Sequence, residues 1–257
     1  MRSMLGMGLI IGSLGLAAAA PAAEVPEFTT EFDLDDCTFS DRGRNVYFSL
    51  EPGDRLVLAE DGEDGREVVQ ITVLGSTRSI SFRTAEGEEI KVRARVVEER
   101  ETLDNELVEV SRNFFARCVE TGNIHYLGEE VDIYEDGEIV SHEGAWRAGV
   151  DGALPGVIMP GSFLLGSRYF QEIAPGVALD RAENVAMGLT LDLPAGRFED
   201  CVRIIETSPL DPRGAGSEKL YCEEIGLVFD SGAELIDYQV AAAERDASRR
   251  LTARSVR

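Results

Sequence analysis

The hydrophobic and polar positions of this chain alternate with the period of a β-strand in several separate stretches. Between residues 89 and 96, apolar side chains occupy every second position and charged side chains occupy the positions between them. Because successive strand residues point to opposite faces, this pattern predicts a strand with one buried face. Similar alternation occurs at residues 69–73, 108–114 and 202–204. No helical stripe long enough to cover a parallel sheet occurs between residues 24 and 230.

Turn sequences separate these stretches at intervals of roughly ten residues, which is typical of antiparallel β-proteins. They include Asp61-Gly62, Glu86-Gly87 and Ser231-Gly232. We therefore expect an all-β, mainly antiparallel body of about a dozen strands, built as a curved sheet, a sandwich or a partly open barrel. The residues after position 240 have a helix-forming composition instead, which predicts a short C-terminal helix.

The N-terminus has the three parts of a secretory signal peptide. Arg2 precedes an apolar run over residues 4–16, and small residues follow up to Ala23. The run is shorter than the roughly 20 apolar residues that span a bilayer, so we expect cleavage near Ala22 or Ala23 rather than a retained anchor. The signal peptide predicts an exported protein, periplasmic or extracellular. Because no later run is long enough to cross a membrane, we expect no transmembrane segment in the mature chain.

The composition along the chain suggests four parts. These are a signal peptide (residues 1–23), an extended acidic N-terminal arm (24–44), an antiparallel β domain (45–240) and a basic helical or disordered tail (241–257). Residues 148–161 are rich in glycine and either divide the β domain in two or form a long loop across one end of it.

The charge balance excludes one class of partner. The chain has 48 acidic against 25 basic residues, a formal net charge of −23. Nucleic acid is not an expected partner, because its phosphates are bound by clustered Lys and Arg. The negative charge could instead attract cations.

The four cysteines form an even set in a chain that we expect to be exported. None stands in a C-x-x-C pair that would suggest zinc or redox chemistry, so disulfides are favoured over free buried thiols. Four cysteines allow three connectivities. We prefer Cys201 with Cys222, because a turn-rich segment between two strands would bring them together, which leaves Cys37 with Cys118.

Three acidic residues have part of the spacing of an EF-hand calcium loop. Asp132, Asp136 and Glu143 occupy its positions 1, 5 and 12, but Tyr134 stands at position 3, where an oxygen ligand is needed. The flanking residues alternate like strands, so we expect a β-hairpin that turns at Asp136 and the glycine after it. A looser surface site for Ca²⁺ at these residues, or at the acidic turn of residues 61–65, stays open; no other cofactor is expected.

Histidine is scarce, which limits the catalytic readings. His125 and His142 are the two histidines, and Trp146 stands where an H-E-x-x-H motif would need a second one. The chain also lacks a G-x-S-x-G elbow, a P-loop and, outside the signal peptide, a dinucleotide fingerprint. We assign no catalytic residue. An enzyme of undetected, hydrolase-like type would have to pair His125 or His142 with a carboxylate.

The densest group of residues suited to a ligand pocket lies between positions 141 and 170. The ligand-binding candidates are His142, Trp146, Arg147, Arg168 and Tyr169, which combine aromatic walls with a few polar groups. Ordinary core packing is the alternative, because Trp and Tyr are commonly buried.

Three longer runs carry a resemblance to a known group of proteins. VDIYEDGEIVSHEGAWRAG, GSRYFQEIAPGVALDRAE and LPAGRFEDCVRIIETSPLDP resemble a family of uncharacterised exported bacterial β-proteins with no assigned activity. The resemblance covers roughly residues 47–238, and the opening YFSLEPGD is similar to a wider group of bacterial envelope β-proteins. It implies a β fold and an extracytoplasmic location, and it implies no reaction.

Together these observations favour a non-catalytic role. We expect a protein that binds a small ligand, a cation or an envelope component. An enzyme and a structural surface or adhesion protein are the alternatives.

Overall fold

The computed structural model describes residues 27–84, 87–212 and 215–240, and within these ranges all helical or strand structure is β-strand. Sixteen strands form one sheet, and every pairing between them is antiparallel. The all-β antiparallel fold is therefore confirmed. The strand count exceeds a dozen because several strands have only two to four residues.

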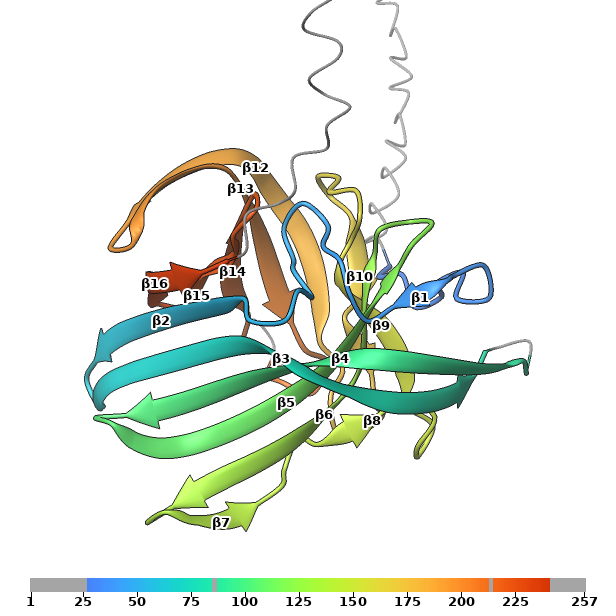
Figure 1. The fold of residues 1–257 in the computed structure, drawn as a ribbon, viewed down its shortest axis with the longest axis horizontal. Helices are drawn as coiled ribbons and strands as arrows, with labels where there is room; N and C mark the ends of the chain where they lie inside the picture. Colours follow the sequence, from blue (N-terminus) through green and yellow to red (C-terminus); the bar gives the residue numbers. More distant parts are fainter. Residues whose placement is uncertain (1–26, 85–86, 213–214, 241–257) are drawn as a thin grey trace, which may run out of the picture.

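In chain order the strands are β1 (Phe39–Ser40), β2 (Arg55–Gly62), β3 (Gly65–Arg83), β4 (Glu89–Leu103), β5 (Glu106–Cys118), β6 (Ile124–Glu135), β7 (Glu138–Ser141), β8 (Trp146–Arg147), β9 (Leu154–Met159), β10 (Arg168–Phe170), β11 (Glu172–Ile173), β12 (Arg181–Leu193), β13 (Gly196–Thr207), β14 (Ser217–Cys222), β15 (Gly226–Asp230) and β16 (Ala233–Gln239). Their order in the sheet is β10-β12-β13-β14-β15-β16-β2-β3-β4-β5-β6-β9-β11, with β1 beside β5 and with β7 and β8 beside β6 (Figure 1).

The two ends of this order are adjacent in the chain, so the sheet curls into a nearly closed barrel. Only Gln171 separates β10, which pairs with β12, from β11, which pairs with β9. Gly156 on β9 allows the close approach there, because a Cβ at this position would lie 2.4 Å from the Gln171 carbonyl oxygen. The glycine-rich residues 148–161 thus include a strand of the same sheet.

The alternation predicted for residues 89–96 is present in β4. Val92, Ala94 and Val96 are buried, while Lys91 and Arg93 are exposed. Arg95 departs from the pattern because its guanidinium group is fully buried beside a bulge in β3, between Val73 and Thr77.

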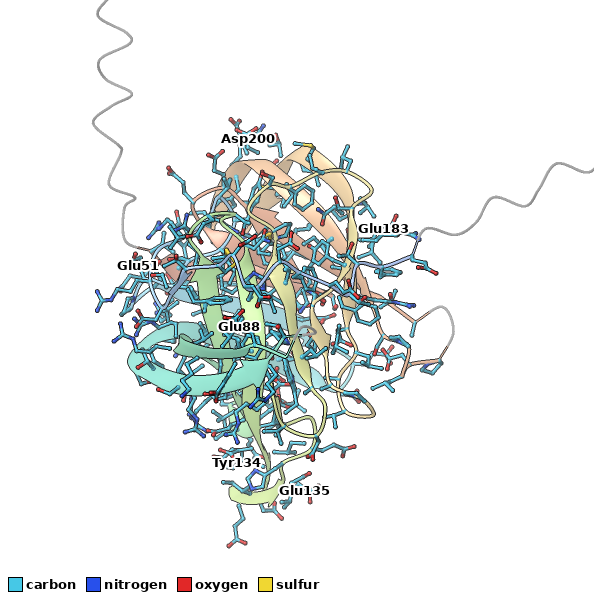
Figure 2. The ribbon with its side chains drawn as sticks, turned by 90° about the vertical axis from the view of Figure 1, so that its right-hand side faces the viewer. Glu51, Glu88, Tyr134, Glu135, Glu183 and Asp200 are labelled. Atoms are coloured by element: carbon cyan, nitrogen blue, oxygen red, sulfur yellow. A yellow bond between two sulfur atoms is a disulfide. The ribbon has the colours of Figure 1, made fainter. Side chains whose placement is uncertain are left out.

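The predicted hairpin is formed by β6 and β7. Asp136 and Gly137 have φ angles of 51° and 79°. Two consecutive residues with positive φ are the requirement of a type I′ turn, which matches the twist of the flanking strands. Figure 2 shows Tyr134 and Glu135 beside this turn, at the opposite end of the molecule from Asp200.

Two disulfides tie the chain together, and both are in the preferred connectivity. Cys201 and Cys222 are direct partners on β13 and β14, with Cα atoms 4.0 Å apart. Cys37 is bonded to Cys118 at the end of β5, which fixes the N-terminal arm to the barrel. The alternative of free thiols is therefore wrong for these four residues.

The described part of the N-terminal arm packs on the barrel. Thr29 forms a bridge with Tyr169 on β10, and the Phe28 ring stacks edge-on against Phe170 with centroids 6.1 Å apart. The predicted signal peptide and the predicted C-terminal helix lie outside the described residues. Among the residues that the structure describes, no helix is long and apolar enough to cross a membrane.

Candidate functional site

A cavity of about 270 Å³ lies inside the barrel, and its lining is unusually acidic. Among the residues that line it, nine have carboxyl groups and only Lys219 has a basic side chain. The nine are Asp54, Glu99, Glu101, Glu109, Glu129, Glu172, Asp180, Glu206 and Asp230. Asp180, one of these nine, is also exposed at the surface. We call this cavity the lumen.

Strand alternation on β4 and β5 brings several of these acids into the lumen. Glu99 and Glu101 are two residues apart and so lie on the same face of β4. In the register of the two strands, Glu99 is opposite Ser111 and Glu101 is opposite Glu109. The acidic wall therefore follows directly from the strand pairing.

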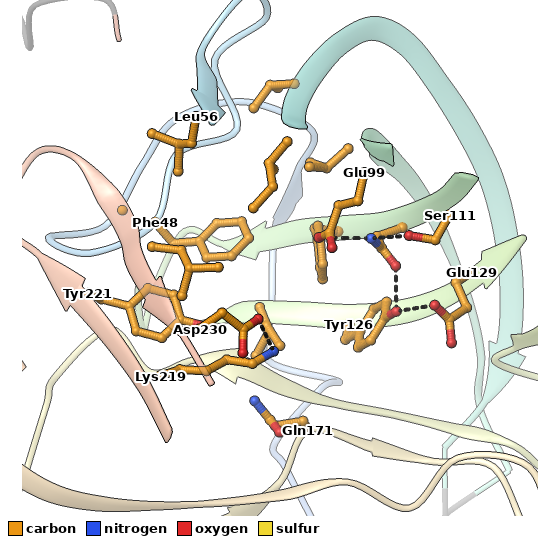
Figure 3. A pocket seen from close by; sticks show the side chains of 18 of the residues that line it. Phe48, Leu56, Glu99, Ser111, Tyr126, Glu129, Gln171, Lys219, Tyr221 and Asp230 are labelled. Carbon is orange, nitrogen blue, oxygen red and sulfur yellow. Dashed lines mark hydrogen bonds and ion pairs between the residues drawn. The ribbon is translucent and has the colours of Figure 1, made fainter. Parts of the chain in front are cut away.

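A chain of hydrogen bonds links three strands along this wall (Figure 3). The Asn113 amide nitrogen donates to Glu99 Oε1 at 3.1 Å, and the Tyr126 hydroxyl lies 2.6 Å from Asn113 Oδ1 and 3.0 Å from Glu129 Oε2. A phenol has one hydrogen to donate. If Tyr126 donates it to Asn113, the contact with Glu129 is a hydrogen bond only when Glu129 is protonated and donates to the phenol oxygen.

The surroundings of Glu129 favour that proton. Burial raises its pKa to about 7, and in the other arrangement of this contact, in which Tyr126 donates to the ionised carboxylate, that hydrogen bond offsets only part of the shift. Burial also raises the pKa of Glu101 to about 7, with a further contribution from the charge of Glu109. Both carboxyl groups thus exchange protons near neutral pH.

Glu101 and Glu109 form the least satisfied pair of acids in the lumen. They are direct partners across β4 and β5, and no hydrogen bond or ion pair joins either carboxylate to another described side chain. Like charges directly opposite each other in a sheet are destabilising. Burial raises the pKa of Glu109 as well. A cation placed between the two carboxylates would relieve this repulsion.

The opposite wall holds the lumen's one lysine. Lys219 Nζ lies 3.0 Å from Glu206 Oε2 and 3.4 Å from Asp230 Oδ2. Burial alone would lower the pKa of Lys219, but the two carboxylates raise it well above its ordinary value. The Gln171 amide nitrogen donates to the other oxygen of Glu206. Lys219 is thereby engaged by two acids on its own side, as Figure 3 shows for Asp230.

Apolar side chains complete the lining. Phe48 and Leu56 lie near Tyr221 in Figure 3, on the side away from Glu129. Ile71, Val73, Phe115 and Leu227 also contribute to the lining. The lumen therefore offers both carboxylates and an apolar surface, the combination that suits an amphipathic cation.

The five ligand-binding candidates from the sequence lie elsewhere, because none of them lines the lumen. The Trp146 ring packs on the lumen residue Tyr126 with centroids 5.2 Å apart. Arg147 is exposed on β8, and Arg168 forms an ion pair with Glu183. The buried Tyr169 hydroxyl donates to Asn184. Their role in binding stays a prediction.

The other candidates lie on β6, in the β6–β7 turn or directly after β7. His142 Nδ1 lies 3.0 Å from Asp132 Oδ1, but its side chain is 68 % exposed and outside the lumen. Asp132 also accepts from Arg112, while Asp136 and Glu143 are exposed. A Ca²⁺ site at Asp132, Asp136 and Glu143 stays a prediction. His125 is buried between Phe32 and Phe39.

The lumen acids were missed because a glutamate in an alternating strand is ordinarily assigned to solvent. Residues 98–101 read EERE, which looks polar on both faces. One sequence feature could have indicated these inward-facing acids. In residues 109–115, strand alternation places Glu109, Ser111 and Asn113 on the same face as the apolar Phe115.

No family model, curated protein or solved structure matches this chain. The fold and the lumen lining alone therefore define the class of protein, which is a nearly closed antiparallel β-barrel with an acidic, partly apolar lumen.

Proposed function

We propose that this chain is an exported, non-catalytic binding protein that holds a small organic cation, an ammonium ion with an apolar body, inside its lumen. One observation carries the proposal. Glu101 and Glu109 lie opposite each other and line a cavity of about 270 Å³, and neither carboxylate has a hydrogen-bond or ion-pair partner among the described side chains. An ammonium group between these carboxylates would replace a repulsion by two charge-assisted hydrogen bonds. The apolar lining beside Phe48 and Leu56 would bury the body of the ligand.

The spacing of the acids supports an organic cation over a metal ion. A metal needs three or more ligand atoms converging on one point. Among the described residues, the one group of three such side chains that comes together is Cys37, Cys118 and His125, outside the lumen. The lumen carboxylates are spread along its walls, which suits a ligand that makes separate polar and apolar contacts.

The enzyme alternative has less support than binding. It requires a histidine beside an acid in a pocket, whereas His142 and Asp132 meet on the outside of the barrel. His125 is buried, and its one hydrogen-bond partner among described groups is the Gly156 carbonyl. Export and the resemblance to envelope β-proteins remain part of the proposal; the two disulfides fit an oxidising compartment.

A thermal-shift series of matched probes tests the charge requirement. We expect 2-phenylethylammonium to raise the melting temperature, while 2-phenylethanol and 3-phenylpropanoate, which have similar shapes and other charges, do not. At a concentration of about 100 times Kd, one bound ligand adds about 2.7 kcal/mol of stability. The measurement is differential scanning fluorimetry near neutral pH.

A Ca²⁺ control and a fluorescence readout complete this test. Ca²⁺ alone separates a metal site from an ammonium site, and an effect of Ca²⁺ without one of the amine would contradict the proposal. Trp146 gives an independent readout, because its ring packs on the lumen residue Tyr126 and its fluorescence should change when the amine binds. Equal stabilisation by the alcohol would show that charge does not select the ligand.

A further inference from the structure

A second group of chemically reactive side chains lies outside the lumen, where the N-terminal arm meets β5 and β6. Cys37 on the arm is bonded to Cys118 at the end of β5. One ring nitrogen of His125 on β6 lies within 4.8 Å of both sulfur atoms. Cysteine and histidine are the two residue types that bind thiophilic metals most strongly.

The imidazole of His125 is held in an orientation that leaves one nitrogen unused. The side chain is 1 % exposed, and Nδ1 lies 3.0 Å from the Gly156 carbonyl oxygen. A carbonyl only accepts, so Nδ1 carries the hydrogen and Nε2 carries a lone pair. Nε2 is buried and has no hydrogen-bond partner. A backbone carbonyl that fixes one nitrogen while the other stays free is the usual arrangement behind a metal-ligating histidine.

A carboxylate stands beside the sulfurs as well. Glu120 Oε2 lies 3.6 Å from Cys118 Sγ and is held by the backbone amide of Thr38 at 2.7 Å. Two sulfurs and an imidazole nitrogen are three ligands of the kind that tetrahedral Zn²⁺ accepts, whereas Glu120 lies near Cys118 but outside the group of three whose ligand atoms all come within 4.8 Å of one another.

We propose that reduction of the Cys37–Cys118 disulfide creates a binding site for Zn²⁺ or a similar thiophilic divalent ion, with Cys37, Cys118 and His125 as ligands and the fourth position open to water. This site is independent of the lumen and of the function proposed for it.

A thiol or phosphine reductant can reduce the Cys37–Cys118 disulfide. The reductant supplies two electrons, the S–S bond breaks, and the two sulfurs take up two protons. Metal binding then releases both protons, because the ligands are thiolates. Zinc–sulfur bonds of about 2.3 Å in a tetrahedron place the sulfurs about 3.8 Å apart. The two sulfurs must therefore move apart after the S–S bond breaks, which side-chain rotation of the two cysteines can provide.

Cobalt(II) spectroscopy on the full chain tests the site, because thiolate-to-cobalt charge transfer and tetrahedral d–d bands distinguish it from carboxylate binding in the lumen. The starting protein is Cys201→Ser/Cys222→Ser, which retains Cys37 and Cys118 as its only cysteines. We expect the reduced protein to bind one equivalent of Co²⁺ with a two-thiolate spectrum, displaced by Zn²⁺, and the oxidised protein to give no such spectrum.

His125→Phe is the matched variant, because a ring of similar size keeps the contacts with Phe32 and Phe39. We expect it to weaken Co²⁺ binding by more than about tenfold, the lower bound seen even for partners of metal ligands. Unchanged affinity in this variant, or a reduced protein without thiolate charge transfer, would overturn the proposal.

The proposal stays testable if the serine variant or the reduced chain does not fold. If the serine background does not fold, reduced wild type is compared with Cys37→Ser/Cys118→Ser, which keeps the other two thiols. If the reduced chain loses its near-ultraviolet circular dichroism, Zn²⁺ must restore it, because metal-binding energy is then folding energy. Failure of Zn²⁺ to do so counts against the site.

Discussion

The protein is expected to be more stable toward unfolding at about pH 5.5 than at about pH 8, by about 2 kcal/mol. The carboxyl groups of Glu101 and Glu129 have pKa values raised to about 7 in the folded chain, so folding takes up protons between the unfolded value near 4.5 and about 7. Their stabilisation is complete below about pH 4.5 and is lost as the pH rises through about 7.

His125 acts in the opposite direction and limits the effect. Burial lowers its pKa to about 4, so the folded chain excludes a proton that the unfolded chain binds below about 6.5. At about pH 5.5 this costs about 1.4 kcal/mol, against about 2 kcal/mol gained from each of the two carboxyl groups before screening by cavity water. The carboxyl groups therefore dominate.

Urea unfolding across the pH range measures this balance. Glu101→Gln/Glu129→Gln should flatten the slope and raise the stability at about pH 8, because glutamine resembles the protonated acid. Glu106→Gln, on the exposed end of β5, should leave the slope unchanged. A wild-type protein that is equally stable at both pH values, or more stable at the higher one, would contradict the assignment of these pKa values.

Arg95→Met is expected to cost about 3–5 kcal/mol of unfolding free energy, because it breaks a buried ion pair from one side. The Arg95 guanidinium donates to Asp41 Oδ2 at 3.1 Å and to the Asp41 carbonyl at 2.8 Å. It also donates to the carbonyls of Leu74, Gly75 and Ser76 at the β3 bulge. The variant leaves all these acceptors without their donor.

Arg93→Met is the matched control for that substitution. Arg93 pairs with the same Asp41 at 3.0 Å, but its side chain is 69 % exposed. Exposed pairs contribute about 1 kcal/mol or less. Equal losses in the two variants, measured by urea unfolding, would show that burial of Arg95 adds nothing.

Much of the fold could be predicted because local patterns decide it. The alternation in residues 89–96, the Asp136-Gly137 turn and the Cys201–Cys222 pair are all local, and all are present. Closure of the barrel could not be predicted from local sequence patterns. It depends on two short strands on either side of Gln171, each of which pairs with a distant strand.

The lumen escaped prediction for a related reason. The sequence marks Glu99, Glu101 and Glu109 as polar, but only the curvature of the sheet decides whether a polar face meets solvent or a cavity. Sequence reasoning treats His125 only as a possible partner for a carboxylate, because no local pattern indicates that Cys37 and Cys118 lie next to it.

Calorimetric titration of 2-phenylethylammonium tests the central claim most directly. We expect wild type to bind one equivalent, and Glu101→Gln/Glu109→Gln to bind at least about 100-fold more weakly, since each of the two charged hydrogen bonds is worth about 1.5–3 kcal/mol. Glu106→Gln/Glu135→Gln makes the same change in net charge on exposed positions and should bind like wild type. Equal affinity in the Glu101/Glu109 variant, or an equal loss in both double variants, would contradict a cation site in the lumen.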